Sequence, residues 1–261
     1  DLQAKGEWTW EAFEALCEKL TRDTDNDGVI DRYAMMSFSS HLLPAALVSN
    51  GAGFVQVDEN GKYYNAAETD AFLEAMNWVM DMVSKYEMKA PEGAEWNYFE
   101  SAFINGEVAL QVHEDYFAGS LANMEDDYGF VFFPKGPRAK TYLYAPSDNI
   151  MVIPACYDAD RAWKIAFAYN LFTNPTPGYT DSDDWKNGYY QKYRDERAVD
   201  ETITMMREPE HQFVWYSDMV TGYDIGSQYI WDVYAQATTP AEKAESMRGT
   251  WQAYIRSEEH T

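Results

Sequence analysis

Apolar side chains recur at helical spacing in three stretches of the chain and predict three helices. The first begins after Thr9, whose hydroxyl suits a helix cap, and continues to Leu20. The second is expected to begin at Asn65, with an apolar stripe along residues 72–83. The third begins at Thr239-Pro240-Ala241-Glu242, where threonine and glutamate make a capping box and proline takes the first helical position.

Short apolar runs between these helices predict buried strands. They are residues 108–112, 129–133 and 149–153; the first follows an Asn-Gly pair, and each of the others ends at a proline. Helices that alternate with strands predict an α/β fold with a mostly parallel or mixed sheet and flanking helices. In such folds ligands bind beyond the strand ends, where short loops converge. Residues 173–193 are the most loop-like stretch and the best candidate for a boundary.

Composition and charge exclude several classes of protein. The 261 residues include 44 acidic and 20 basic side chains, a formal net charge of -24, which repels nucleic acid and anionic membranes. A hydrophobic content of 46% excludes a disordered chain. No apolar run is long enough to insert into a membrane. The first residues lack a signal-peptide pattern and an initiator methionine, and we expect the chain to be part of a longer protein.

Cysteine and histidine spacing indicates no required cofactor. Cys17 and Cys156 lie far apart without metal-ligand spacing, and we expect both to be buried thiols. The four histidines are scattered and show neither metal-ligand nor triad spacing: His41, His113, His211 and His260. Motifs for nucleotide binding and for a nucleophilic serine are absent from the sequence.

One acidic loop has the spacing of a calcium site. Carboxylates stand at loop positions 1, 3, 5 and 9, which are Asp23, Asp25, Asp27 and Asp31. Position 6 is Gly28, and position 7 is Val29, which offers its backbone carbonyl. Ala34 stands where an EF-hand has its bidentate acid, so any calcium would be held weakly, at about 10⁻⁴ to 10⁻³ M. The alternative is a solvated turn that aspartate and glycine simply suit. The sequence leaves both interpretations open.

The segment His113 to Gly119 is the best candidate for ligand binding. It follows the predicted strand 108–112, where side chains face the ligand in this fold class. Tyr116 or Phe117 offers a flat face to a sugar ring, and Glu114 or Asp115 offers hydroxyl acceptors. Both aromatics could instead be core residues. A hydrolase would use the two acids as a pair, although adjacent residues at a strand end point in diverging directions.

Several segments in register resemble the extracellular solute-binding proteins of sugar ABC transporters, the family that includes maltose-binding protein. The segments that carry the resemblance are Trp8 to Phe13, Leu20 to Tyr33, Ala102 to Leu110, Tyr128 to Phe130 with Phe133 to Pro137, and Ile150 to Ala155. The order and spacing of these segments match across nearly the whole chain.

The resemblance implies a truncated periplasmic-binding-protein-like type II fold, in which the first part of the N-terminal lobe is absent. Residues 1–148 would form the second lobe, 149–194 a hinge strand and helical segment of the first lobe, and 195–261 helices that return to the second lobe. It further implies a set of ligand-binding residues: Tyr116 stacking on sugar with Glu114 nearby, Ser40 and His41 in a turn, Ser147 and Asp148 near the hinge, and Tyr223 and Asp224 in a late loop.

A protein of this kind does no covalent chemistry and delivers a small carbohydrate to the membrane permease of an ABC importer. The resemblance implies an extracellular location with a lipoprotein anchor in the full-length parent. Two alternatives stay open: a carbohydrate-active hydrolase and a calcium-stabilised cell-surface binding module.

Overall fold

The computed structural model describes residues 1–122, 124–146, 151–175, 177–178, 183–220 and 222–258. The α-helices are α1 (Trp10–Leu20), α2 (Ser39–Ser49), α3 (Asp70–Tyr86), α4 (Tyr98–Ile104), α5 (Ala159–Thr173), α6 (Lys186–Tyr190), α7 (Thr204–Met206), α8 (Ile225–Tyr234) and α9 (Pro240–Glu258). The strands are β1 (Val55–Val57) and β2 (Tyr63–Asn65). Short 3-10 or π turns are η1 (Asp115–Leu121), η2 (Ala198–Ile203), η3 (Pro209–His211) and η4 (Tyr216–Met219).

Helix starts follow the local sequence closely where a side chain can cap them. The Thr9 hydroxyl accepts a hydrogen bond from the backbone of Ala12 and begins α1. In the predicted capping box, Thr239 accepts from the backbone N–H of Glu242, whose carboxylate accepts from the Thr239 backbone. The second helix was predicted to begin at Asn65 and instead begins after Thr69. Asn65 ends β2, and its side chain accepts from Ala67 in a turn, which delays the helix.

Backbone pairing is mixed, but little of it forms regular ladders. β1 and β2 pair antiparallel, with Gln56 opposite Tyr64. A second set of extended segments is held in parallel by single bridges, in which Met35 pairs with Glu87 on one side and with Leu110 on the other. The predicted strand 108–112 is therefore reduced to one bridge at Leu110. The backbone N–H groups of Ala109 and Leu110 both donate to the Ala34 carbonyl. The backbone N–H of Val112 donates to the Ser37 hydroxyl.

The other two predicted strands are absent from the described part of the chain. Residues 129–133 are extended but unpaired, because side chains take their backbone groups: Phe132 donates to Gln3, and its carbonyl accepts from Trp8. Residues 149 and 150 lie outside the described residues, and residues 151–153 are exposed and form no strand.

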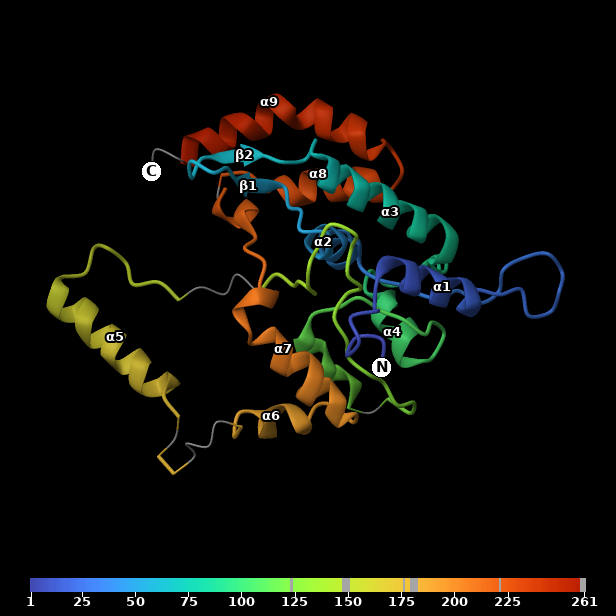
Figure 1. The fold of residues 1–261 in the computed structure, drawn as a ribbon, viewed down its shortest axis with the longest axis horizontal. Coiled ribbons are helices and arrows are strands. Elements are labelled where there is room, and N and C mark those ends of the chain that lie inside the picture. Colours follow the sequence, from blue (N-terminus) through green and yellow to red (C-terminus); the bar gives the residue numbers. More distant parts are fainter. Residues whose placement is uncertain (123, 147–150, 176, 179–182, 221, 259–261) are drawn as a thin grey trace.

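The main core lies between α3, α8, α9 and β1 (Figure 1). Its centre is a group of aromatic rings in edge contact around Phe54, which lies 5.2 Å from Phe72, 5.4 Å from Tyr229 and 6.0 Å from Trp251 between ring centroids. Cys17 is buried as predicted, whereas Cys156 is exposed; both are free thiols. Among the described helices, none is long and apolar enough to cross a membrane.

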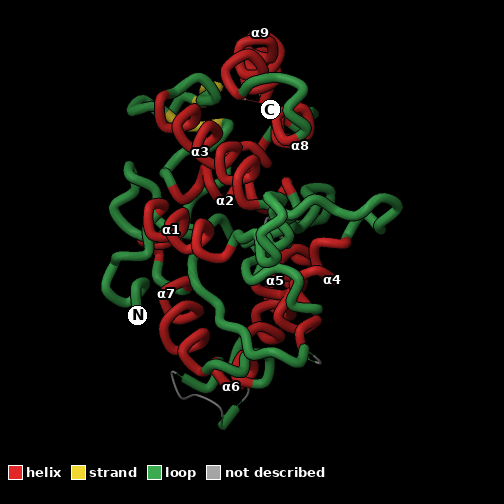
Figure 2. The backbone as a smooth tube through the Cα atoms, turned by 90° about the vertical axis from the view of Figure 1, so that its right-hand side faces the viewer, coloured by secondary structure: helices red, strands yellow, loops and turns green. Residues whose placement is uncertain are grey.

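Helix α5 stands apart from the rest of the chain (Figure 1, yellow). None of its residues is buried, and its large apolar side chains are exposed, with Trp163 stacked on Phe167 at 5.1 Å. The other helices and loops form one elongated body, with α9 at one end and α6 at the other (Figure 2). Helix α5 lies within residues 149–194, whose assignment to the first lobe stays a prediction.

Candidate functional site

A continuous group of rings lies where the start of α2, the turn before α4, the start of η1 and helix α8 meet. Phe38 is its hub: its ring centroid lies 6.2 Å from Trp96, 5.6 Å from Trp231 and 5.4 Å from His41. His41 lies 4.6 Å from His113, which lies 5.7 Å from Tyr116. We call Phe38, Trp96, Tyr116 and Trp231 the aromatic patch, and His41 with His113 the histidine pair.

The three outer rings of the aromatic patch are unusually exposed. Trp96 is 76% exposed, Tyr116 63% and Trp231 51%. Exposed aromatic rings that gather in one place are typical of binding surfaces, and a ring as open as that of Tyr116 does not belong to the core. The alternative that Tyr116 is a core residue is therefore wrong, whereas Phe117 is buried and stacks on His113 at 4.1 Å.

The histidine pair supplies polar groups beneath these rings. His41 Nδ1 and His113 Nε2 are buried and have no hydrogen-bond partner within the described structure. Burial lowers the pKa of His41, and burial together with the neighbouring His41 lowers the pKa of His113. The lowered pKa values favour the neutral form of both rings. A neutral imidazole has one donor and one acceptor nitrogen, which suits a hydroxyl group.

Carboxylates lie at the edge of the histidine pair. Glu100 Oε1 is 3.7 Å from His113 Nε2. The charges of Glu114 and Glu100 act on both His41 and Tyr116, which places both carboxylates near the aromatic patch. Burial, followed by these charges, raises the pKa of the Tyr116 hydroxyl. The site therefore combines aromatic faces, neutral imidazoles and carboxylate acceptors.

Glu114 and Asp115 point to different parts of the molecule. The charge of Glu114 acts on the pKa values of His41 and Tyr116. Asp115 instead lines a separate pocket of about 390 Å³, together with Tyr144 and Gln212. The two acids are thus associated with different parts of the molecule.

The remaining predicted ligand-binding residues fall into three groups. Ser40 is half-buried in the first turn of α2, next to His41. Tyr223 stacks on Tyr254 at 4.5 Å, and Asp224 caps α8 by accepting from Ser227, so both have structural roles. Ser147 and Asp148 lie outside the described residues.

Sequence reasoning missed Trp96, Trp231 and Glu100 as site residues, and it included His113 only as the first residue of the candidate segment. The helical spacing of Trp231 and Tyr234 alone favours a core position for both rings. The position of Trp231 around the helix axis could have indicated its exposure. The buried residues Ile225, Tyr229 and Val233 define one face of α8, and Trp231 lies on the opposite face.

In the acidic loop the carboxylates of Asp23, Asp25 and Asp27 lie within 4.8 Å of one another. Asp31 points elsewhere: it accepts from the Thr24 hydroxyl at 2.6 Å and from the Thr24 backbone, which lowers its pKa. The Val29 backbone N–H donates to Asp27. The loop therefore gathers three of the four predicted carboxylates.

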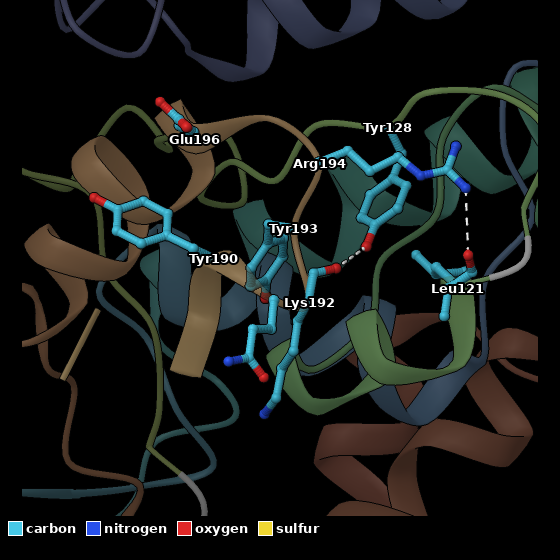
Figure 3. Close-up of a pocket in the computed structure, with 9 residues that line it drawn as sticks. Leu121, Tyr128, Tyr190, Lys192, Tyr193, Arg194 and Glu196 are labelled. Carbon is cyan, nitrogen blue, oxygen red and sulfur yellow. Dashed lines mark hydrogen bonds between the residues drawn. The ribbon is translucent and has the colours of Figure 1, made fainter. Parts of the chain in front are cut away.

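A second pocket, of about 420 Å³, lies between η1 and residues 190–196 (Figure 3). Its polar groups bind one another: the Tyr128 hydroxyl donates to the Lys192 carbonyl at 2.6 Å, and Arg194 donates to the carbonyls of Ala122 and Met124. These groups are already paired within the protein, which favours the aromatic patch as the ligand site.

The chain belongs to the bacterial extracellular solute-binding protein family, whose model matches residues 1–169. None of the curated proteins matches the chain. The family is one of binding proteins, and the fold is that of periplasmic-binding-protein-like solute receptors.

Solved structures of such receptors share this fold at low sequence identity. The maltose/maltodextrin-binding domain from Bdellovibrio bacteriovorus, bound to maltotriose, has a TM-score of 0.61 and 15% identity; the match covers 97% of this chain and 67% of that one. A solute-binding protein from Agrobacterium radiobacter K84 with ribitol has a TM-score of 0.60 and 16% identity, covering 100% and 67%.

UgpB from Mycobacterium tuberculosis, in complex with glycerophosphocholine, has a TM-score of 0.63 and 16% identity; the match covers 96% of this chain and 64% of that one. The chain thus spans about two thirds of the length of these receptors.

Proposed function

We propose that the chain is the ligand-binding part of a solute receptor that presents a neutral sugar or polyol to the permease of an ABC importer. The observation that carries this proposal is the aromatic patch, with its exposed rings above two buried ring nitrogens, His41 Nδ1 and His113 Nε2, that have no hydrogen-bond partner in the described structure. In a two-lobed receptor this surface would form one wall of the ligand cleft.

The chemistry of the patch favours a neutral polyhydroxylated ligand. The apolar face of a sugar ring stacks on an aromatic ring such as Tyr116. Its hydroxyl groups can bond to His41 Nδ1 and to His113 Nε2, which is the donor of its ring because His113 Nδ1 accepts from the Glu114 backbone N–H. The carboxylates of Glu100 and Glu114 accept further hydrogen bonds. An anionic ligand would be repelled by the same carboxylates and by the net charge of -24.

The ligands of the structural neighbours support this class. Two of those receptors carry a sugar and a polyol, maltotriose and ribitol. Low identity prevents transfer of a particular ligand, so the proposal extends to the class alone.

Binding without turnover fits the site better than hydrolysis. A glycosidase needs two carboxyl groups facing one bond, about 5 to 10 Å apart. Glu114 faces the aromatic patch, whereas Asp115 lines the pocket of Tyr144 and Gln212. We therefore propose that the site holds its ligand without cleaving it.

Transport would couple binding to lobe closure. A second lobe closing over the aromatic patch would exclude water from the ligand and give the permease a distinct closed form to recognise. We further propose extracellular anchoring of the parent as a lipoprotein, and weak calcium binding at Asp23, Asp25 and Asp27.

Binding can be tested on the 261-residue chain by isothermal calorimetry with neutral sugars and polyols, maltotriose and ribitol among them. Tyr116→Ala should weaken binding by about 1 to 3 kcal/mol, the amount expected for loss of a buried stacking face. Trp163→Ala is the matched control, because Trp163 is 62% exposed on α5, away from the patch, and its loss should leave affinity unchanged.

Three outcomes would contradict the proposal. Equal losses from Tyr116→Ala and Trp163→Ala would show that the aromatic patch is not the site. Binding of polyamines but of no sugar or polyol would refute the ligand class, because carboxylates and aromatic faces also hold cations. Release of reducing ends during the titration would identify a hydrolase.

A further inference from the structure

The turn η3 holds a buried imidazole beside two exposed carboxylates. Glu208 immediately precedes the turn. Pro209, whose φ is restricted by its ring, takes the first position, and Glu210 and His211 complete the turn. The His211 residue is only 6% exposed, and its ring packs 5.5 Å from Phe132. The two glutamates face solvent.

The hydrogen bonds of His211 fix which ring nitrogen carries the proton. Nδ1 lies 2.8 Å from the carbonyl oxygen of Tyr142 and 3.1 Å from the Thr141 hydroxyl. A carbonyl oxygen only accepts, so Nδ1 must be the donor. In the neutral ring Nε2 then carries a lone pair.

That lone pair faces a carboxylate. Nε2 lies 3.6 Å from Glu208 Oε2, beyond hydrogen-bond distance. A cation between these two atoms could bind both of them, and a metal ion is one such cation.

The surrounding geometry fits a metal ion. One ligand atom from each of Glu208, Glu210 and His211 can be chosen so that all three lie within 4.8 Å of one another. Tetrahedral bonds of about 2.0 to 2.2 Å place neighbouring ligand atoms roughly 3.4 Å apart, close to the observed Nε2–Oε2 separation. The bond from Nδ1 to a backbone carbonyl is the usual support of a metal-binding histidine.

We propose that Glu208, Glu210 and His211 form a binding site for a divalent transition-metal ion of the Zn²⁺ class. One imidazole and two carboxylates suit such an ion, with solvent in the fourth position. Calcium and magnesium prefer six or more oxygen ligands and are disfavoured. This site differs in chemistry from the all-oxygen loop at Asp23 to Asp27.

A bound ion would clamp a junction between two distant segments. The His211 carbonyl accepts from the Tyr144 backbone at 3.0 Å, and the Tyr144 carbonyl accepts from Phe213 at 2.8 Å. The ion would fix the turn that presents these groups, while the imidazole stays bonded to Tyr142. Metal binding should therefore raise the melting temperature, because the ion binds the folded chain more tightly than the unfolded chain.

Titration of the chain with Zn²⁺ alone tests the site. We expect one saturable site by calorimetry, with affinity reduced at least about tenfold in both Glu210→Gln and His211→Asn. Glu210 is exposed, so its variant should fold even if His211→Asn does not. Glu245→Gln, an exposed glutamate on α9, is the matched control and should bind like wild type. Co²⁺ absorption should change in His211→Asn if that ring is a ligand.

Two results would overturn the proposal. The first is Zn²⁺ binding that survives Glu210→Gln and His211→Asn but is lost in His113→Asn, which would place the ion at the histidine pair. The second is the absence of saturable Zn²⁺ binding by the wild-type chain.

Discussion

Replacing Glu87 with glutamine should stabilise the protein more at pH 8 than at pH 5. The Glu87 carboxylate is almost fully buried, with 6% of the residue exposed. Its Oε1 accepts from the Ser37 backbone at 3.1 Å, and its Oε2 accepts from the Tyr234 hydroxyl at 2.8 Å. The side chain therefore joins α8, which carries Trp231, to the residue that precedes Phe38.

Burial raises the pKa of Glu87 from 4.5 to about 7, although its two hydrogen bonds favour the ionised form. The unfolded chain thus releases this proton at lower pH than the folded chain. The free energy of unfolding falls as pH rises from about 4.5 to about 7 and stays low above that range. The whole loss is about 3 kcal/mol, of which about 2 kcal/mol falls between pH 5 and pH 8.

Glutamine cannot ionise and removes this loss. Its carbonyl still accepts from Ser37, and its amide can donate to the Tyr234 oxygen. Urea unfolding of wild type and Glu87→Gln at both pH values measures the effect. The stability of the variant relative to wild type should be about 2 kcal/mol greater at pH 8 than at pH 5. Glu92→Gln, at an exposed position, should show no such change.

The same difference between wild type and Glu87→Gln at both pH values would refute the reasoning, because it would mean that Glu87 titrates alike in the folded and unfolded chains.

Three further predictions concern local packing, a helix cap and the acidic loop. Gly136→Ala should cost about 1 to 3 kcal/mol, since its methyl group would lie 2.7 Å from the Asn50 side chain. Gly249→Ala meets nothing within 4 Å in α9 and should gain up to about 1 kcal/mol; equal effects in chemical unfolding would contradict this. Thr239→Ala should lose about 1 kcal/mol with its capping bond, and an unchanged melting temperature would disprove that role. Added calcium should raise the melting temperature of wild type but not of Asp25→Ala; identical curves with and without calcium would favour the solvated turn.

The helix starts at Thr9 and Thr239 were predictable from sequence, whereas the start of α3 at Thr69 and the short strands were not. Thr9 and Thr239 fix helix starts through bonds to residues three positions on, which a local pattern captures. A strand needs a distant partner. Residues 129–133 look like a strand, but Gln3 and Trp8 occupy the backbone groups of Phe132 that a ladder would have used.

The candidate site shows the same division. The family resemblance predicts Tyr116, Glu114 and His41 as ligand-binding residues. The position of Tyr116 and Glu114 after an apolar run supports the same prediction. The structure gathers the three residues around His113. Trp96 contacts Phe38 from a turn whose sequence gives no sign of that contact. The histidines looked scattered because 72 residues separate His41 from His113 in a chain that brings their ring centroids to 4.6 Å.

The imidazole signals of His41 and His113 report most directly on whether a neutral sugar or polyol binds at the aromatic patch. We expect the ¹H–¹⁵N NMR signals of both rings to shift saturably when a sugar or polyol that binds the chain is added. The reason is that His41 Nδ1 and His113 Nε2, which are free of partners in the described structure, would bond to the hydroxyl groups of the ligand. The His211 ring, whose Nδ1 is held by Tyr142, should stay unchanged. Saturable ligand binding that leaves both His41 and His113 unmoved would contradict the assignment of the site.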